Sequence, residues 1–599
     1  MRKIKWLSIL LLLTVAVCVF IGCNRNNNVP EGPVESGVDY DVIVVGGDPE
    51  GVCAAVSSAR NGLKTLLIEN DEALGGLMTL GKLNFIDICE SRDGSILTQG
   101  LFMEFYDAVG GTAFDVEVAK QFFYDWVAGE ENATLKLNTA FVAPVMDGKQ
   151  ITGVVVEENG EQVTYTASRI IDATVDADVA AAAGVPYTVA GEDIGEKERQ
   201  MGVTLVFELS GIDWATVVDY LENDDNAGTG ATEKTAWGYT REGYAYEPKD
   251  ELMRLRGFNA ARQDNGNVLI NALIIFGVDA MSEESKAEGI ARAQKELEYI
   301  VPYVREHFVG FENAELVGTA SQLYIRESRH IIGEYQLTID DVLENRDQWD
   351  KIAIVAYPAD IQPTAGQTYG TVIGSPDRYA IPFRSLVPLE VENMLVIGRS
   401  ASYTSLAAGS ARVIPVGMAE GEAAGVASAY SLHQDMSFRA MSADKEAIAS
   451  VQKTLKKQGA YLDDFEVKEA FMDHWAYPGV KVIRSLGQLD GGYSNDYRLD
   501  VPVGKWRLQN MINNTMNKTG KDVEKVLDVS DPVTNGNMVA VVARVAGITA
   551  DTYEAQIAAL QEKGIITDDI LQHMGAEGDT PLAAEAVMIV ANLYIYMAE

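Results

Sequence analysis

Residues 38–51, VDYDVIVVGGDPEG, decide the expected fold of this chain. Asp39–Val45 is a short, β-branched and nearly continuous apolar run, which predicts a strand buried on both faces. A glycine-rich turn follows, then a helical run at Val52–Asn61, and a second strand at Lys64–Ile68 ends in Glu69. In such a β–turn–helix–β unit the helix N-terminus binds the pyrophosphate of a dinucleotide, and the carboxylate accepts hydrogen bonds from ribose hydroxyls.

The turn departs from the G-x-G-x-x-G pattern at one position. Gly46 and Gly51 match, whereas Asp48 replaces the second glycine and places a carboxylate where phosphate is expected. The alternative is a tight turn without a ligand, but the position of Glu69 favours the dinucleotide and opposes a 2′-phosphate. The candidate residues of this unit are Gly46, Gly47, Asp48, Pro49, Glu50, Gly51 and Glu69.

Two further glycine-rich segments favour FAD over NAD. Gly75 and Gly76 follow the second strand, where flavoproteins of the glutathione-reductase type pack glycines against the flavin. Residues 393–398 (NMLVIG) read as a glycine-ended strand, and residues 410–418 (SARVIPVGM) open a helix of small residues, which predicts a second helix N-terminus beside the cofactor. Its candidate cofactor-binding residues are Gly398, Arg412, Pro415, Gly417 and Met418, with helix-cap support as the alternative for Arg412.

Together these segments make the sequence resemble the exported FAD-dependent oxidoreductase family, loosely termed xanthan lyase-like and related to the flavoprotein part of heterodisulfide reductase. Four more segments carry the resemblance, at residues 75–87, 170–187, 325–338 and 379–388, and it covers roughly residues 39–435. It implies non-covalent FAD, with Asp172, Ala173 and Thr174 closing the chain onto the cofactor. The chain departs from the family at Val175, where glycine is usual, and at Gln362, where histidine is frequent.

The expected fold class is α/β: a glutathione-reductase-type, Rossmann-like FAD-binding domain with an inserted α+β substrate domain, followed by a mostly helical repeat domain. The predicted division is a lipoprotein signal peptide (1–23), a tether (24–38), a first FAD-binding segment (39–190), the substrate domain (191–375), a second FAD-binding segment (376–435), a helical linker (436–464) and an S-layer homology-like helical domain (465–599).

The substrate domain has one dense group of titratable residues. Arg326, Glu327 and Arg329, followed by Tyr335, are the catalytic candidates, because positive charge there would hold an anionic substrate or stabilise reduced flavin. The alternative is a buried structural network of ion pairs. No CxxC motif occurs, so neither a zinc site nor an iron–sulfur cluster is expected, and Cys53 and Cys89 are expected to be unpaired buried thiols.

The N-terminus predicts export and anchoring. Basic residues precede an apolar run that ends in Phe20-Ile21-Gly22-Cys23, which resembles a bacterial lipobox, with an uncleaved anchor helix as the alternative. Lipidated Cys23 would hold the protein at the extracytoplasmic membrane face. The repeats from residue 465 resemble wall-binding modules, but the arginine of their motif is missing. Two interpretations therefore remain: the repeats bind an anionic cell-wall polymer, or they form a helical module that packs on the flavoprotein domain.

Composition limits the partners. With 88 acidic against 48 basic residues the formal charge is −40, which opposes nucleic-acid binding. The sequence predicts an enzyme that transfers hydride between a small organic substrate and flavin, with an external electron acceptor that no motif identifies. The competing hypotheses are a redox-neutral lyase or hydrolase of sugars with structural flavin, and a non-enzymatic surface-binding protein that lost its flavin.

Overall fold

The computed structural model describes residues 37–599 except 198, 227 and 368, so the predicted signal peptide and Cys23 lie outside the described residues. Strand β1 (Tyr40–Val45), helix α2 (Pro49–Arg60) and strand β2 (Thr65–Ile68) form the predicted unit, and β1 and β2 pair in parallel from Val42↔Thr65 to Val45↔Ile68. Every residue of β2 is buried, as expected for a strand covered on both faces.

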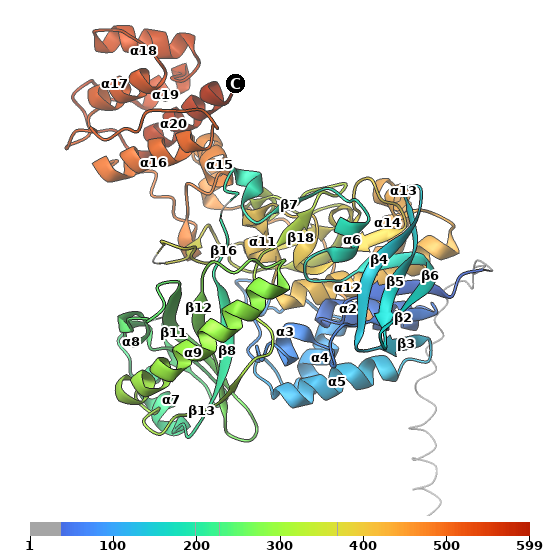
Figure 1. The fold of residues 1–599 in the computed structure, drawn as a ribbon. Coiled ribbons are helices and arrows are strands. Elements are labelled where there is room, and N and C mark those ends of the chain that lie inside the picture. Colours follow the sequence, from blue (N-terminus) through green and yellow to red (C-terminus); the bar gives the residue numbers. More distant parts are fainter. Residues whose placement is uncertain (1–36, 198, 227, 368) are drawn as a thin grey trace, which may run out of the picture.

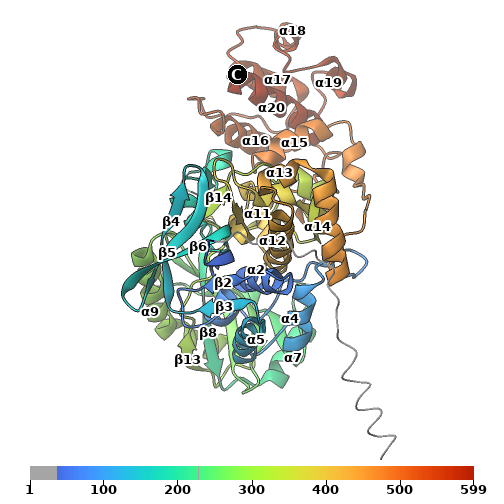
Figure 2. The same ribbon diagram turned by 90° about the vertical axis from the view of Figure 1, so that its right-hand side faces the viewer.

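A seven-stranded sheet organises this region of the chain, in the order β3-β2-β1-β6-β5-β4 with β19 added beside β6 (Figures 1 and 2). The long strand β6 (Glu161–Asp172) joins two arrangements. Its first half pairs antiparallel with β5 (Gln150–Glu158), which pairs with β4 (Thr139–Asp147). Its second half runs parallel to β1 and to β19 (Met394–Val396), so residues far apart in the sequence end at one edge of the sheet.

Helix α12 (Ile414–His433) packs directly on α2, and two glycines allow this close approach. A Cβ atom on Gly421 would lie 2.1 Å from the carbonyl oxygen of Glu50, and one on Gly425 would lie 2.5 Å from Cβ of Ser57. The helix of small residues expected from the sequence therefore exists, and its small residues are what bring its N-terminus beside that of α2.

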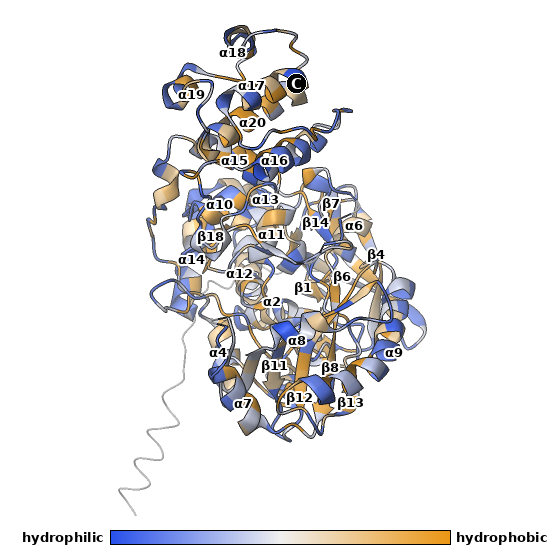
Figure 3. Ribbon diagram, turned by 90° about the vertical axis from the view of Figure 1, so that its left-hand side faces the viewer, coloured by the Kyte–Doolittle hydropathy of each residue, from blue (hydrophilic) through white to orange (hydrophobic). Residues whose placement is uncertain are grey.

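An inserted six-stranded antiparallel sheet lies at the lower left of Figure 1, beside this layer, in the order β13-β8-β12-β11-β10-β9. Its central strands β8 (Val203–Ser210) and β12 (Val268–Ile275) are buried along nearly their whole length and are coloured hydrophobic in Figure 3. The other strands are β9 (Gly230–Ala231), β10 (Thr235–Gly238), β11 (Met253–Arg262) and β13 (Glu315–Thr319), and the associated helices are α7 (Trp214–Glu222), α8 (Thr240–Ala245) and α9 (Glu283–His307).

Short elements complete the body. They are α3 (Gly76–Thr79), α4 (Leu101–Val109), α5 (Val116–Ala128), β3 (Ala133–Lys136), α6 (Asp178–Ala182), β7 (Tyr187–Val189), β14 (Arg329–Ile331), α10 (Ile339–Leu343), β15 (Lys351–Val355), β16 (Asp360–Ile361), β17 (Thr371–Val372), β18 (Tyr379–Pro382), α11 (Ser405–Ala411), α13 (Phe438–Ala443) and α14 (Lys445–Gln458). Cys53 and Cys89 are buried free thiols, as expected.

The C-terminal segment forms a helical lobe at the top of Figure 1 with a hydrophobic core of its own. Its helices are α15 (Tyr477–Ser485), α16 (Lys505–Asn517), α17 (Asn535–Val545), α18 (Tyr553–Glu562), α19 (Asp568–His573) and α20 (Ala583–Ala598). Pro502, Pro532 and Pro581 precede α16, α17 and α20 by two or three residues, and Thr534 caps α17 through a capping box.

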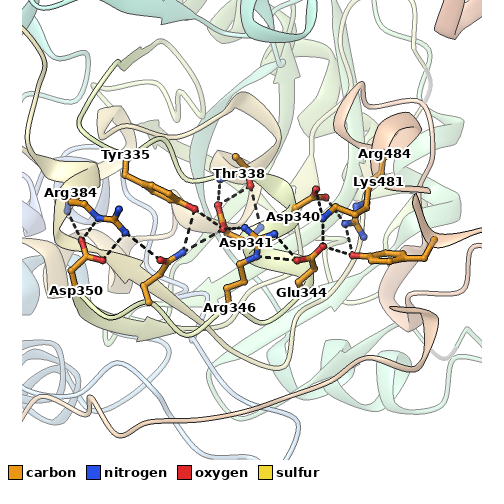
Figure 4. A network of polar contacts seen from close by, with 12 residues as sticks. Tyr335, Thr338, Asp340, Asp341, Glu344, Arg346, Asp350, Arg384, Lys481 and Arg484 are labelled. Atoms are coloured by element: carbon orange, nitrogen blue, oxygen red, sulfur yellow. Dashed lines mark hydrogen bonds and ion pairs between the residues drawn. The ribbon is translucent and has the colours of Figure 1, made fainter. Parts of the chain in front are cut away.

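Figure 4 shows how this lobe joins the body. Arg484 is fully buried and contacts Asp340 of α10 at 2.5 Å, while Lys481 contacts Glu344 at 2.8 Å.

Within the described range, no helix is both long and apolar enough to cross a membrane.

Candidate functional site

A cavity of about 730 Å³ opens where the predicted segments converge. Its wall includes the end of β1, the start of α2, the end of β2, the segment after β6 and the start of α12. The candidates that line it are Gly46, Asp48, Pro49, Glu50, Glu69, Ala173, Thr174, Gly398, Arg412, Gly417 and, from the catalytic set, Arg326. The other cofactor candidates, Gly47, Gly51, Gly75, Gly76, Asp172, Pro415 and Met418, are not among its lining residues.

The turn before α2 needs glycine for steric reasons. Gly46 has φ +102°, and a Cβ atom there would lie 2.4 Å from the carbonyl oxygen of Ala173. A Cβ atom on Gly51 would lie 1.9 Å from the carbonyl oxygen of Gly46. Gly51 therefore allows the close contact with Gly46 that the turn requires. The first turn of α2, with its unpaired backbone N–H groups, borders the cavity.

Glu69 stands at the end of β2 with its carboxyl group fixed. One oxygen accepts a hydrogen bond from the Gly47 N–H at 2.5 Å, and the other accepts from the Asp71 N–H at 2.8 Å. Burial raises the pKa of Glu69 to about 7. Since the side chain also lines the cavity, it is positioned to accept hydrogen bonds from a ligand's hydroxyl groups.

Asp48 turns its carboxyl group toward the start of α3. A Cβ atom on Gly76 would lie 1.8 Å from Oδ1 of Asp48, and the Leu77 N–H donates a hydrogen bond to the carboxyl group. Burial, followed by the charge of Glu50, raises the pKa of Asp48 to about 7, so the charge expected to repel phosphate is partly neutralised near neutral pH. Gly76 thus makes room for Asp48 and Gly75 makes room for Phe123, while Leu77 and Met78 border the cavity.

The second helix N-terminus meets the first at Glu50. A Cβ atom on Gly398 would lie 2.6 Å from Oε1 of Glu50, and one on Gly417 would lie 3.3 Å from Cβ of Glu50. Arg399 follows Gly398 in the cavity wall and donates to the Val175 carbonyl at 2.7 Å and to Asp176 Oδ1 at 2.5 Å. Its charge counteracts the rise in pKa of both Asp48 and Glu50.

Asp172 supports the wall from behind. Its carboxyl group accepts hydrogen bonds from the N–H and hydroxyl of Thr174 at 3.0 and 2.6 Å, and from the Ala180 N–H at 2.7 Å. These bonds hold residues 173–175 against the cavity, and Val175, the departure from the family pattern, contributes its carbonyl to Arg399 and Ser400. Pro415 and Met418 are buried within α12 and position its first turn.

The four catalytic candidates do not come together. Arg326 lines the cavity, whereas Glu327, Arg329 and Tyr335 do not. Glu327 pairs with Arg199 at 3.2 Å, and Arg329 pairs at 2.8 Å with Asp178, which is a lining residue. The Tyr335 hydroxyl donates to Asp341 at 2.8 Å within the network of Figure 4. For Glu327, Arg329 and Tyr335 the structure thus favours the alternative of a structural polar network, because each side chain bonds to a protein partner and none of the three lines the cavity.

Asp87, Tyr324 and Arg399 are among the lining residues that were not predicted as site residues. Asp87 lies deep in the protein with its side chain exposed to the cavity, and Tyr324 and Arg399 also line it. Asp87 ends the segment 75–87 that carries the family resemblance, and Arg399 directly follows the glycine-ended strand. Their positions next to these motifs could have indicated that both residues belong to the site. Among the residues that the structure describes, no group of three or more His, Cys, Asp or Glu side chains is arranged to hold a metal ion.

The family model described as FAD dependent oxidoreductase matches residues 41–455. The chain belongs to this family. FAD is the cofactor of the family and of this chain. The residues present fit this group: the glycine turn at Gly46, the carboxylate of Glu69 and the N-termini of α2 and α12 border one cavity, whose volume falls in the range of cofactor sites.

Curated relatives match over short segments. The chain is 49% identical over 53 residues to pseudooxynicotine dehydrogenase of a Pseudomonas species, covering 9% of this chain and 11% of that protein. It is 26% identical over 180 residues to digeranylgeranylglycerophospholipid reductase of Methanocella arvoryzae, covering 26% and 44%. The chain therefore spans less than half the length of these relatives.

Among solved structures, a geranylgeranyl bacteriochlorophyll reductase-like protein from Thermoplasma acidophilum matches with a TM-score of 0.36 and 12% identity, over 87% of this chain and 98% of that one. The flavin-dependent brominase Bmp2 matches with a TM-score of 0.35 and 12% identity, over 75% of this chain and 93% of that one. TM-scores this low support no argument about substrate.

Proposed function

We propose that this flavoprotein is tethered to the extracytoplasmic face of a bacterial membrane and transfers hydride between a small organic substrate and FAD. The observation that supports it best is the single cavity that joins Glu69 and two helix N-termini to a second end carrying Asp87, Tyr324, Arg326 and Arg412. A nucleotide site with additional charged groups at its far end is the arrangement that a flavin enzyme with a separate substrate requires.

Different residues of the chain would bind the cofactor and exclude water. The first turns of α2 and α12 would hold the pyrophosphate and the flavin edge through backbone N–H groups, and Glu69 would accept hydrogen bonds from the ribose. Leu77, Met78, Leu83 and Phe85 also line the cavity and would exclude water from the reacting atoms. Bound FAD supplies the hydride-accepting centre, and the protein supplies orientation and charge.

Glu69→Ala tests the nucleotide assignment. We expect the affinity for FAD to fall by about 1–3 kcal/mol, the scale of hydrogen bonds made to a charged group. Titration of flavin-free protein with FAD, followed by flavin fluorescence, measures this loss. Glu72→Ala is the matched control, because Glu72 is an exposed glutamate three residues along the chain. Equal affinities in the two variants would contradict the ribose assignment.

The redox-neutral lyase or hydrolase is the competing function, because fold alone does not determine chemistry. Anaerobic mixing of the holoenzyme with candidate reductants separates the two. An oxidoreductase loses its visible flavin band during turnover, whereas a lyase with structural flavin converts sugar while the band stays unchanged.

Membrane attachment rests on the lipobox-like segment that ends in Cys23. Cys23→Ser should move the protein from the membrane fraction to the soluble fraction, because one lipidated cysteine would provide the anchor. Retention of the variant in membranes would refute lipidation as the anchor. For the C-terminal lobe we keep binding of an anionic wall polymer as a proposal, which sedimentation of the purified lobe with cell walls tests.

A further inference from the structure

The end of the cavity away from Glu69 carries charged groups that the nucleotide does not explain. Asp87, Tyr324, Arg326 and Arg412 line it, and Tyr357 and Asp360 stand behind them within electrostatic reach. These residues come from the segment after α3, the segment before β14, the loop around β16 and the start of α12. Their convergence is a feature of the tertiary structure and has no counterpart in any one motif.

Arg326 is anchored to the protein through one of its nitrogens. It is buried, its Nη1 donates to the Gly202 carbonyl at 3.0 Å and to the Thr204 hydroxyl at 2.9 Å, and its guanidinium stacks on the Tyr324 ring at 3.9 Å. Burial, with the nearby charges of Arg412 and Arg256 acting in the same direction, lowers its pKa to about 10. Arg326 therefore supports the wall and adds positive potential to the cavity.

Arg412 differs because its contacts are long and incomplete. Its guanidinium donates to the Tyr324 hydroxyl at 3.2 Å and to the Asp360 carbonyl at 3.4 Å, and its nearest carboxylate oxygen, on Asp360, lies at 3.7 Å. Its Nε is buried without a hydrogen-bond partner among the described residues, and the side chain is only 5% exposed. A buried guanidinium with unused donors at a cavity wall is expected to receive an anion.

The surrounding charges favour the same sign of ligand. Arg256, Arg326 and Arg412 act on one another across this end of the cavity, and the carboxyl groups that act on them are Asp87 and Asp360. Three guanidinium groups therefore face two carboxyl groups. Because such groups interact strongly inside a protein, the excess of positive charge selects an anionic partner such as a carboxylate.

Asp87 supplies a hydrogen-bond acceptor at the same end of the cavity. Its side chain is open to the cavity, and the Tyr357 hydroxyl donates a hydrogen bond to it. Burial raises its pKa, while the hydrogen bond from Tyr357 and the charge of Arg412 act to keep it ionised. A carboxyl group open to the ligand accepts hydrogen bonds from a hydroxyl or an ammonium group.

We infer that this end of the cavity binds a small organic acid whose carboxylate pairs with Arg412 and whose adjacent hydroxyl or ammonium group donates to Asp87. The inference rests on the proposed function, since it names the substrate class for the same site. Arg412 provides charge and planar donors for the carboxylate, and Asp87 fixes which carbon faces the cofactor.

Isothermal titration of the FAD-loaded full chain tests this pairing with four probes: lactate, alanine, propionate and lactamide. We expect lactate or alanine to bind at least tenfold more tightly than lactamide, which lacks the charge, and than propionate, which lacks the donor. Arg412→Gln should remove the preference over lactamide, and Asp87→Asn should remove the preference over propionate. Arg544→Gln is the matched control, because Arg544 pairs with Asp528 in the C-terminal lobe and neither residue lines the cavity.

The result that overturns the inference is equal binding, or no binding, of all four probes to flavin-loaded protein. An Arg412→Gln variant that loses only FAD affinity would also overturn it, because Arg412 would then serve the cofactor. Absorbance of the same samples reports FAD occupancy. Protein that takes up no flavin contradicts the proposed function together with this inference, whereas flavin-loaded protein that ignores carboxylates contradicts this inference alone.

Discussion

Gly421→Ala should separate the two helices that form the cofactor end of the cavity. The added Cβ atom would lie 2.1 Å from the carbonyl oxygen of Glu50, which is 1.3 Å inside the ordinary contact distance of 3.4 Å. Since a backbone carbonyl cannot rotate away, α2 and α12 must move apart. Overpacking of this kind costs about 1–3 kcal/mol. Replacing glycine by alanine in a helix interior returns about 1 kcal/mol.

The expected net loss of stability is therefore up to about 2 kcal/mol, accompanied by weaker FAD binding because the first turn of α2 borders the cavity. Gly289→Ala in α9 is the control, since its nearest neighbour is a methyl group of Val278 at 2.9 Å, which can adjust. Thermal unfolding of both flavin-free variants, with FAD titrations alongside, measures the difference. If Gly421→Ala matched Gly289→Ala in both assays, the steric argument for the helix contact would be wrong.

Two further predictions concern pH and truncation. Burial raises the pKa of Asp48, Glu69 and Glu422 to about 7, above the usual range for carboxyl groups. A carboxyl group whose pKa is raised in the folded state contributes stability at low pH, and this contribution is lost as the pH rises through the folded-state pKa. The flavin-free protein should therefore melt at a lower temperature at pH 8 than at pH 6. An unchanged or higher melting temperature at pH 8 would contradict this. Deleting residues 465–599 should leave FAD bound, because the C-terminal lobe has its own core and the family match ends at residue 455. Loss of flavin absorbance from the truncated protein would show that the lobe contributes to the cofactor site.

The first nucleotide-binding unit could be predicted because its determinants are local. Strand β1, the turn at Gly46 and helix α2 follow one another without interruption, and Glu69 ends the next strand, so spacing alone fixes their relation. The second helix N-terminus could also be predicted, since the glycine-ended strand and the helix of small residues are each recognisable by composition. The helix needs small residues because Gly421 packs directly against the backbone of Glu50.

The catalytic candidates could not be sorted in the same way. Arg326 and Glu327 are adjacent in a segment that belongs to no helix or strand, so sequence periodicity does not fix the directions of their side chains. Arg326 lines the cavity, whereas Glu327 pairs with Arg199. Tyr335 was grouped with them by proximity in the sequence. It belongs instead to the polar network that also holds Arg484 of the C-terminal lobe (Figure 4).

The sequence by itself determined the α/β class, the nucleotide turn and the FAD family, because strand, turn and helix signals act over a few residues. Only the tertiary structure decided which charges share the cavity. Asp87 and Arg412 lie far apart along the chain and carry no common motif, and they meet because the packing of α12 on α2 brings distant segments to one wall. A side chain's surroundings in a folded protein depend on long-range packing, which local sequence does not encode.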